Sequence, residues 1–332
     1  MDIRNTRSLK TFAAERTQNA PQEKKIVLIY SGLTIGLAAL ATLIIFLLDL
    51  RIDQTGGLSQ MGTRTILSAL QSTLSLLHPL AMLCLEVGYL AAMLRIARGQ
   101  YASPRTLKLG FDRFWILVRV LLIQILIFGG IAFGCVYMAS MIFVMSPWGQ
   151  PFMELVTPMM AEISVLNPQF VLEEAMYFQV VKTMLPMFAI TAIVFAFFGL
   201  PLVYQFRMVT YVIIDKPGLS AWQVIGMSRR MMRGNCRKLL RLDLSYWWYY
   251  LILLVVALVS EAHSVLVLLG VTLPFADTTV FFLFYGAYLA LTFAAYYFLR
   301  NKVEVTYALF YDAVKPEEPK TDGVVLGNIF RM

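Results

Sequence analysis

The chain has 332 residues, of which 59% are hydrophobic and 14% are charged, and its mean hydropathy is +0.70. Soluble domains carry about 25% charged residues, so this composition excludes a soluble globular domain, a disordered chain and a collagen-like repeat. The net charge is +8, and long apolar runs separate the basic residues into blocks. This distribution is typical of the loops of a membrane protein rather than of a nucleic-acid-binding surface. We therefore expect no nucleic acid partner.

The N-terminal segment, residues 1–25, contains six basic residues and is expected to be a cytoplasmic segment. The uncharged run Ile26–Leu48 follows it. As a helix this run is about 35 Å long, enough to cross a hydrocarbon core of about 30 Å. It is also longer than the apolar core of a signal peptide, so we expect an uncleaved first span.

Five further apolar runs are each expected to cross the membrane as a helix. The second contains Pro79, and the amphipathic stretch Met61–Thr73 before it either lies along the interface or continues the same helix. We therefore expect an all-α polytopic membrane protein with amphipathic interfacial helices. Its transmembrane domain, residues 26–313, precedes a flexible cytoplasmic tail, residues 314–332. The six expected spans are residues 26–48, 74–94, 114–146, 185–204, 246–260 and 279–299.

Basic residues lie almost entirely on one side of these spans. With six spans, 25 of the 28 Lys and Arg residues fall on the side that holds the N-terminus, and Arg51, Arg64 and Lys182 fall on the other. An excess of Lys and Arg marks cytoplasmic loops. The distribution therefore predicts that both termini are cytoplasmic.

Small residues recur at four-residue spacing in three of the expected spans, beginning at Gly32, Gly130 and Gly286. This spacing lets two transmembrane helices approach closely. We expect these motifs to mark helix contacts within the chain, and a homodimer face remains an alternative.

Ionisable residues inside the expected spans are candidate functional residues, because charge in hydrocarbon is costly unless it is paired or hydrated. Four polar residues of the second span fall in one broad stripe of a helix. The depth of Glu86 is compatible with an ion pair to Arg119, with Arg207 as the competing partner. Such a pair either fixes the register of the helices or belongs to a relay. The expected intramembrane polar cluster is Gln71, Ser75, His78, Glu86, Arg119 and Arg207.

The sequence contains no pattern that predicts catalysis. Helical HExxH, GxSxG and GxxxxGK motifs are absent from it. Glu173-Glu174 matches the paired glutamate of CAAX-type membrane proteases, but Phe178 stands where those enzymes have arginine. The cysteines lie far apart and form no CxxC pair. We expect a protein that is not an enzyme and that binds no metal or cofactor. The cysteines are Cys84, Cys135 and Cys236.

A basic amphipathic helix is predicted after residue 219. Ser220 can cap a helix over Ala221–Arg233, and Gly234-Asn235 can end it. Its apolar and basic side chains predict a helix in the cytoplasmic interface that contacts anionic lipid headgroups, with a protein partner as an alternative. The expected apolar residues are Trp222, Val224, Ile225, Met227 and Met231. The expected lipid- or partner-binding surface is Arg229, Arg230, Arg233, Arg237, Lys238 and Arg241.

Six short motifs occur in order along the chain: Leu94–Gly99, Gly110–Phe114, Asp215–Pro217, Ser228–Asn235, Leu242–Tyr246 and Thr306–Tyr311. Together they resemble the bacterial integral-membrane family catalogued as domain of unknown function 975, and the resemblance covers most of the chain. It implies a multi-span protein of the bacterial cytoplasmic membrane, with no established activity. The stretch Leu251–Leu299 is longer than expected for that family, which leaves the count of the last two spans open.

Three classes of function remain, of which the third, an enzyme acting on lipids, lacks a recognisable site. The favoured one is a non-catalytic accessory component of the membrane that interacts with lipids or with a partner protein through its basic surface. The alternative is a transporter or exporter of a small solute or peptide that uses a polar path near Gln71, His78 and Glu86.

Overall fold

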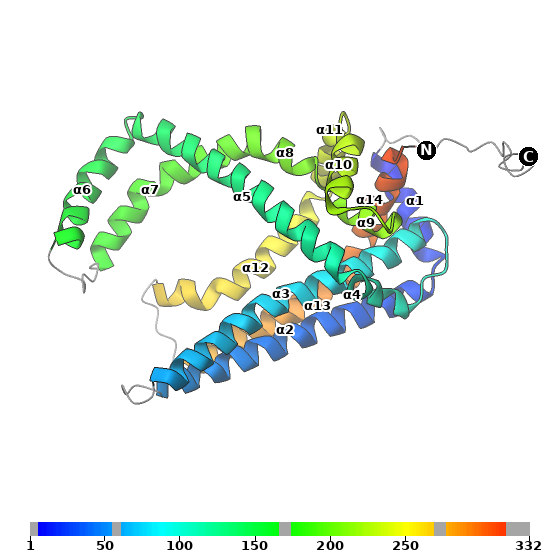
Figure 1. The fold of residues 1–332 in the computed structure, drawn as a ribbon, viewed down its shortest axis with the longest axis horizontal. Coiled ribbons are helices and arrows are strands. Elements are labelled where there is room, and N and C mark those ends of the chain that lie inside the picture. The colour runs from blue at the N-terminus through cyan, green and yellow to red at the C-terminus, as the bar shows by residue number, and fades with distance from the viewer. Residues whose placement is uncertain (1–5, 55–60, 166–173, 269–276, 317–332) are drawn as a thin grey trace, which may run out of the picture. The chain divides into compact units, whose positions relative to one another are not determined.

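The computed structural model describes residues 6–54, 61–165, 174–268 and 277–316, and these residues form helices without a strand (Figure 1). The chain divides into two compact units. Unit 1 comprises residues 1–117, 208–219 and 237–332, and unit 2 comprises residues 118–207 and 220–236. Most of the expected tail, residues 317–332, lies outside the described residues.

Unit 1 is built around α3. In sequence order it holds α1 (Thr6–Gln18), α2 (Gln22–Gln54), α3 (Met61–Ala97), the 3-10 helix η2 (Pro104–Lys108), α4 (Leu109–Asp112), α9 (Val209–Asp215), most of α11 (Cys236–Ser245), α12 (Trp247–Leu268), α13 (Asp277–Ala295), the π-helical turn η4 (Tyr296–Arg300) and α14 (Asn301–Val314). Helix α3 contacts α1, α2, α4, α9, η2 and α14, and Figure 1 shows α2, α3 and α13 running alongside one another.

Unit 2 holds the remaining helices. They are most of α5 (Phe114–Val144), α6 (Gly149–Val165), α7 (Glu174–Val194), the π-helical turn η3 (Phe195–Gly199), α8 (Leu200–Tyr204) and α10 (Ala221–Met232). A small buried cluster of Cys135, Ala139 and Val194 packs α5 against the end of α7.

The described residues contain five helical segments that are long and apolar enough to cross a membrane, or six if one bent pair counts as a single span. The chain is therefore an all-α, multi-pass membrane protein. The five segments are Gln22–Ile52, Gly62–Ala97, Phe114–Val144, Lys182–Asp215 and Thr278–Val314. The bent pair joins Cys236–Ser245 to Trp247–Ala262 at 66°.

Each expected span has a counterpart, but several limits differ. The stretch Met61–Thr73 continues the second span as one helix, so it does not form a separate interfacial segment. The expected fifth span, residues 246–260, meets the criteria for a span only together with the bent helix that precedes it. The sixth does not end at residue 299 but continues through η4 and α14 to Val314.

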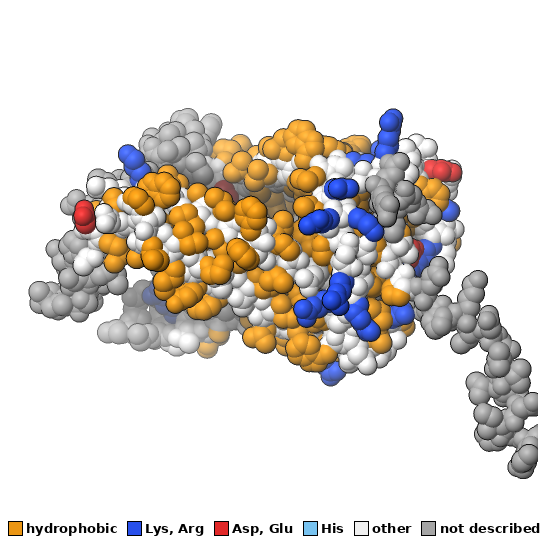
Figure 2. Space-filling view, turned by 90° about the horizontal axis from the view of Figure 1, so that it is seen from above, with side chains coloured by type: hydrophobic (Ala, Val, Ile, Leu, Met, Phe, Trp, Pro, Cys, Tyr) orange, Lys and Arg blue, Asp and Glu red, His pale blue; other side chains and the backbone are white. Residues whose placement is uncertain are grey.

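The outer faces of the spans are apolar. Only 11% of the most apolar part of α2 and of α5 is buried, whereas 67% of the corresponding part of α3 is buried. Leu126 and Phe133 of α5 are each 74% exposed, and Figure 2 shows hydrophobic side chains over much of the visible face. Such surfaces are stable next to hydrocarbon and not next to water. Helix α3 is therefore the protein-facing span of unit 1.

Two glycines outside the expected small-residue motifs, Gly88 and Gly110, allow α3 and the segment η2–α4 to approach each other closely. A Cβ atom at Gly88 would lie 2.1 Å from the backbone oxygen of Leu107, and one at Gly110 would lie 1.9 Å from that of Cys84. The expectation that the spaced glycines mark helix contacts is wrong, because a Cβ atom at any of them has no neighbour within 4 Å. They are Gly32, Gly36, Gly130, Gly134 and Gly286.

We expect Gly110→Ala to lower the free energy of unfolding by about 1–3 kcal/mol, because the new methyl group would displace the α3 backbone. Gly32→Ala is the matched control. It adds the same methyl group in open space and should leave stability unchanged or slightly raised, since alanine is the better helix former. Thermal unfolding of the purified protein in detergent measures both, and equal unfolding temperatures for the two variants would contradict the close contact.

Candidate functional site

The guanidinium of Arg300 is the centre of a buried polar site in unit 1. Arg300 ends the π-helical turn η4 and is 8% exposed. Its Nη2 forms an ion pair with Glu86 of α3, and its Nη1 donates a hydrogen bond of 2.8 Å to the hydroxyl of Tyr30 on α2. The Tyr30 hydroxyl donates in turn to Glu86 at 2.6 Å. The three side chains form a closed ring of charge-assisted hydrogen bonds, which are stronger than neutral ones.

Three tyrosine rings surround the same guanidinium. The Arg300 Cζ atom lies 4.5 Å from the ring centroid of Tyr296 and 5.3 Å from those of Tyr30 and Tyr89. The rings of Tyr30 and Tyr89 stack with centroids 4.2 Å apart. Glu304, one turn further along α14, places Oε1 3.6 Å from Arg300 Nε. Cation–π attraction and two carboxylates together compensate the buried positive charge.

The prediction of the partner of Glu86 is wrong. We expected Arg119, with Arg207 as the competitor, whereas Glu86 pairs with Arg300 and Tyr30. Arg119 and Arg207 both belong to unit 2, while Glu86 belongs to unit 1. The depth of two residues in neighbouring spans says how far each lies from the membrane surface, but not whether their helices face each other.

The other members of the expected cluster do not join this site. Gln71 donates a hydrogen bond of 2.8 Å to Asp49, and Ser75 is exposed. The Nε2 atom of His78 is buried and has no hydrogen-bond partner in the described part of the chain. The stripe on α3 therefore has three separate environments along its length, and its residues do not converge on Glu86.

A second ion-pair network joins the C-terminal ends of three helices in unit 1. Arg98 binds Asp312 of α14 through two nitrogens at 2.6 and 2.9 Å, and its Nη1 lies 2.7 Å from Asp215 at the end of α9. Lys315 Nζ and the Tyr311 hydroxyl also donate to Asp215, at 2.5 and 3.1 Å. The hydrogen bonds from Arg98 to Asp312 hold the pKa of this guanidinium above its ordinary value. The network therefore stays charged and fixes α3, α9 and α14 together.

Arg113 closes the end of α9 from another side. Its Nη1 donates to the backbone oxygens of Ile213 and Ile214, the latter at 2.9 Å. Carbonyls in the last turn of a helix lack partners within the helix. Burial lowers the pKa of the Arg113 guanidinium.

Tyrosines connect α14 to the bent pair α11–α12. The Tyr307 hydroxyl donates to Asp243 and lies 2.6 Å from the hydroxyl of Tyr250. The hydroxyls of Tyr246 and Thr306 lie 2.8 Å apart. The residues of the short sequence motifs on α3, α9, α11 and α14 therefore meet in the interior of unit 1, where they stabilise the fold.

Helix α10 in unit 2 agrees with the predicted amphipathic helix. The Ser220 hydroxyl accepts from the backbone N–H of Gln223, whose side chain accepts from the backbone N–H of Ser220, so both form a capping box. The helix ends at Met232, and Gly234 follows with φ of +82°. Among the expected apolar residues, Trp222 is 65% exposed and Met227 is half-buried, whereas the other three are buried.

Three arginines of this region line a cavity of about 440 Å³ in unit 2, together with Gln205, Met232, Gly234 and Cys236. These arginines, Arg229, Arg230 and Arg233, are all exposed. Arg229 Nε donates a hydrogen bond of 3.1 Å to the Gln205 side chain, and the Ser228 hydroxyl donates to the Gln205 backbone oxygen at 3.0 Å. The cavity thus has a positively charged wall, and two hydrogen bonds hold Gln205 in its lining.

The other half of the expected basic surface belongs to unit 1. Arg237 and Arg241 of α11 are exposed, and Lys238 is half-buried. The six residues are therefore two groups of three, one in each unit.

Comparisons with known proteins add no relative: the sequence matches no family model, no curated protein and no solved structure. The resemblance described above stays a prediction. The function is therefore inferred from the side chains themselves.

The most important residue of the buried site, Arg300, was not among the candidates. It directly follows the expected sixth span, residues 279–299, so it is not counted among the ionisable residues inside the spans. One signal could have identified it: Tyr296 and Glu304 stand four residues before and after it, which places all three on one face of a helix. Tyr30 and Tyr89 carry no comparable local signal.

We expect Arg300→Met to lower the free energy of unfolding by about 3 kcal/mol, because it leaves the half-buried Glu86 carboxylate without its cationic partner. The double variant Glu86→Gln/Arg300→Met removes both charges and should lose less stability than the single variant. Lys302→Met, an exposed neighbour, is the control and should leave the unfolding temperature unchanged. Equal losses for the single and double variants would contradict the assigned ion pair.

Proposed function

We propose that the chain is a non-catalytic accessory component of the bacterial cytoplasmic membrane and that it binds anionic lipid headgroups through α10. One observation carries the proposal: three exposed guanidinium groups line a single cavity at the end of this helix. Guanidinium groups bind phosphate oxygens through paired hydrogen bonds, so this wall suits a phosphate-bearing headgroup.

The apolar content of α10 supports a position at the membrane surface. Trp222 exposes 65% of its surface, and tryptophan favours the headgroup zone of a bilayer. The excess of basic residues on the N-terminal side of the spans favours a cytoplasmic position for α10. The cytoplasmic leaflet carries anionic lipids, which attract basic segments by about 1 kcal/mol for each Lys or Arg near its surface.

The resemblance in sequence supports the bacterial location, and the lack of catalytic motifs in the sequence supports an accessory role. Arg237 and Arg241 on α11 add exposed positive charge next to α10 in the chain. A protein partner with an acidic surface is the alternative ligand for these basic residues.

We expect the triple variant Arg229→Gln/Arg230→Gln/Arg233→Gln to bind phosphatidylglycerol about a hundredfold more weakly than the natural protein, since the three lost guanidinium groups together remove about 3 kcal/mol of attraction. Native mass spectrometry of the full chain, purified in mild detergent and incubated with phosphatidylglycerol, counts the retained lipids. The same measurement with phosphatidylcholine, which has no net charge, gives the retention that does not depend on an anionic headgroup.

The matched control is Lys25→Gln/Arg105→Gln/Lys108→Gln, which removes three exposed charges outside α10. Its retention of phosphatidylglycerol should stay close to that of the natural protein. An equal loss in the control, or unchanged retention in the α10 variant, would contradict the proposal.

A further inference from the structure

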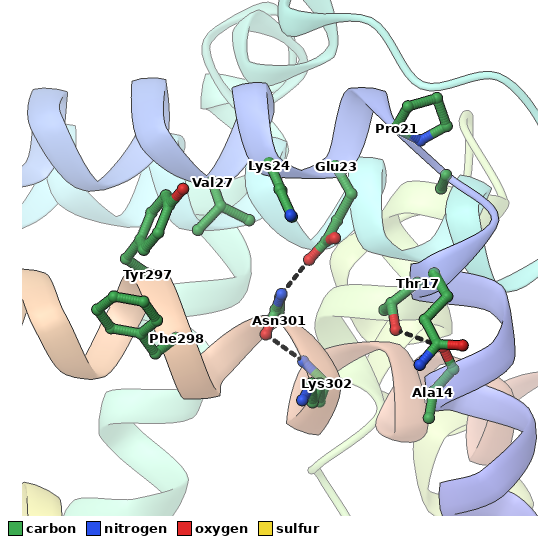
Figure 3. A pocket seen from close by; sticks show the side chains of 12 residues that line it. Ala14, Thr17, Pro21, Glu23, Lys24, Val27, Tyr297, Phe298, Asn301 and Lys302 are labelled. Carbon is green, nitrogen blue, oxygen red and sulfur yellow. Dashed lines mark hydrogen bonds between the residues drawn. The ribbon is translucent and has the colours of Figure 1, made fainter.

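A second cavity, of about 660 Å³, opens in unit 1 where α2 begins and α14 passes beside it. Figure 3 shows its walls: Glu23, Lys24 and Val27 come from α2, Tyr297 and Phe298 from η4, and the end of α1 closes one side. Its volume lies within the range of about 300–1,000 Å³ that is usual for small-molecule sites. None of these residues belongs to the basic cavity of α10.

The floor of this cavity is a buried carboxylate that is only half satisfied. Glu23 is 4% exposed, and one of its oxygens accepts a hydrogen bond from the Asn301 side chain. The Asn301 oxygen in turn accepts from the backbone N–H of Lys302 at 2.7 Å, so the amide is held at both ends. In Figure 3 the other oxygen of Glu23 points into the space between α2, α14 and α1. Within the described residues this carboxylate forms no ion pair, and a buried charge without one is costly.

Two exposed ammonium groups stand at the rim. Lys24 and Lys302 both line the cavity and are exposed, and neither forms an ion pair with a described residue. Although both lie near Glu23, neither approaches it to within the 4 Å of an ion pair. The site therefore offers a single negative group in its depth and two positive groups at its mouth.

The remaining wall is apolar and aromatic. Val27 is buried, whereas Phe298 is 63% exposed and stands beside Tyr297 on the open side. The cavity lies at the start of the first span, the depth at which lipid headgroups meet the hydrocarbon. A ligand that fits it has a cationic end, an anionic centre and an apolar remainder.

We propose that this cavity binds the headgroup of a zwitterionic aminophospholipid. The primary ammonium donates to the free oxygen of Glu23, the phosphate lies between Lys24 and Lys302, and the glycerol and acyl chains follow Val27 and the two aromatic rings. An anionic headgroup without an amine offers the free oxygen of Glu23 no hydrogen-bond donor and places a like charge near it. A trimethylated ammonium has no N–H to donate to it.

The test uses the full chain in mild detergent, stripped of lipid and then incubated with four phospholipids of identical acyl chains. They are phosphatidylethanolamine, its N-methyl and N,N-dimethyl forms, and phosphatidylcholine. Native mass spectrometry measures the occupancy of each. We expect phosphatidylethanolamine to be retained about tenfold more than phosphatidylcholine, the value of one charge-assisted hydrogen bond, with the methylated forms in between. Equal retention across the series would overturn the proposal without any variant.

Three variants locate the site. Glu23→Gln keeps an acceptor for Asn301 and should abolish the preference for the primary amine, whereas Lys24→Ala/Lys302→Ala should lower the retention of all four lipids. Lys25→Ala, an exposed neighbour on α2 that does not line the cavity, should change neither. An unchanged preference in Glu23→Gln, or a lost preference in Lys25→Ala, would overturn the assignment.

Two further measurements distinguish a lipid from a soluble ligand with the same headgroup, and this cavity from the cavity at α10. Soluble O-phosphoethanolamine, at the concentration of the lipid, should not displace it, and displacement would overturn a lipid as the ligand. The triple α10 variant should keep its preference for phosphatidylethanolamine even where its retention of phosphatidylglycerol falls. If the triple α10 variant lost both its retention of phosphatidylglycerol and its preference for phosphatidylethanolamine, the proposal of two separate lipid sites would be overturned.

Discussion

The charge of Arg300 has to be compensated inside unit 1, and this requirement fixes the positions of three spans. A guanidinium keeps its proton under all ordinary conditions, so burial cannot be relieved by neutralisation. Compensation needs Glu86 from α3 and Tyr30 from α2 at hydrogen-bond distance, and it needs aromatic faces on the remaining sides. Because hydrophobic attraction between helices is weak in lipid, a polar contact of this kind specifies which faces of α2, α3 and η4 meet.

The same helical segment then extends the arrangement toward the membrane surface. Beyond Arg300, α14 is buried almost throughout, from Val303 to Tyr311. Its tyrosines bind Asp243 and Asp215, which belong to α11 and α9, and Asp312 binds the end of α3. Helix α14 therefore has the role of a core helix, while α2 and α5 present leucines and phenylalanines to lipid.

The features that could be predicted from the sequence are those set by neighbouring residues. The first span follows from an uncharged run and the third from a run with Arg119 as its one charge, and α10 follows from the cap at Ser220 and the glycine at 234. The partner of Glu86 could not be predicted, because the pair joins residues 214 positions apart and depends on which helix faces meet. The glycine motifs misled for the same reason: spacing shows that a helix has a smooth face, not that another helix covers it. The bend between α11 and α12 could not be predicted either, because the change from a charged to an apolar run at Tyr246 indicates where a span begins but not the angle between two consecutive helices.

The π-helical turn η4 shifts the phase of a continuous helical segment. A π turn holds one residue more than an α turn, so the side chains beyond it are rotated by about 100° relative to an uninterrupted helix. Before the turn, Leu283 and Leu291 of α13 are 66% and 43% exposed, and after it the side chains of α14 point into the core. One additional residue thus converts a lipid-facing periodicity into a protein-facing one without a loop. The length of this segment is consequently coupled to its orientation, because adding or removing a single residue there would turn the whole core face of α14 away from its partners.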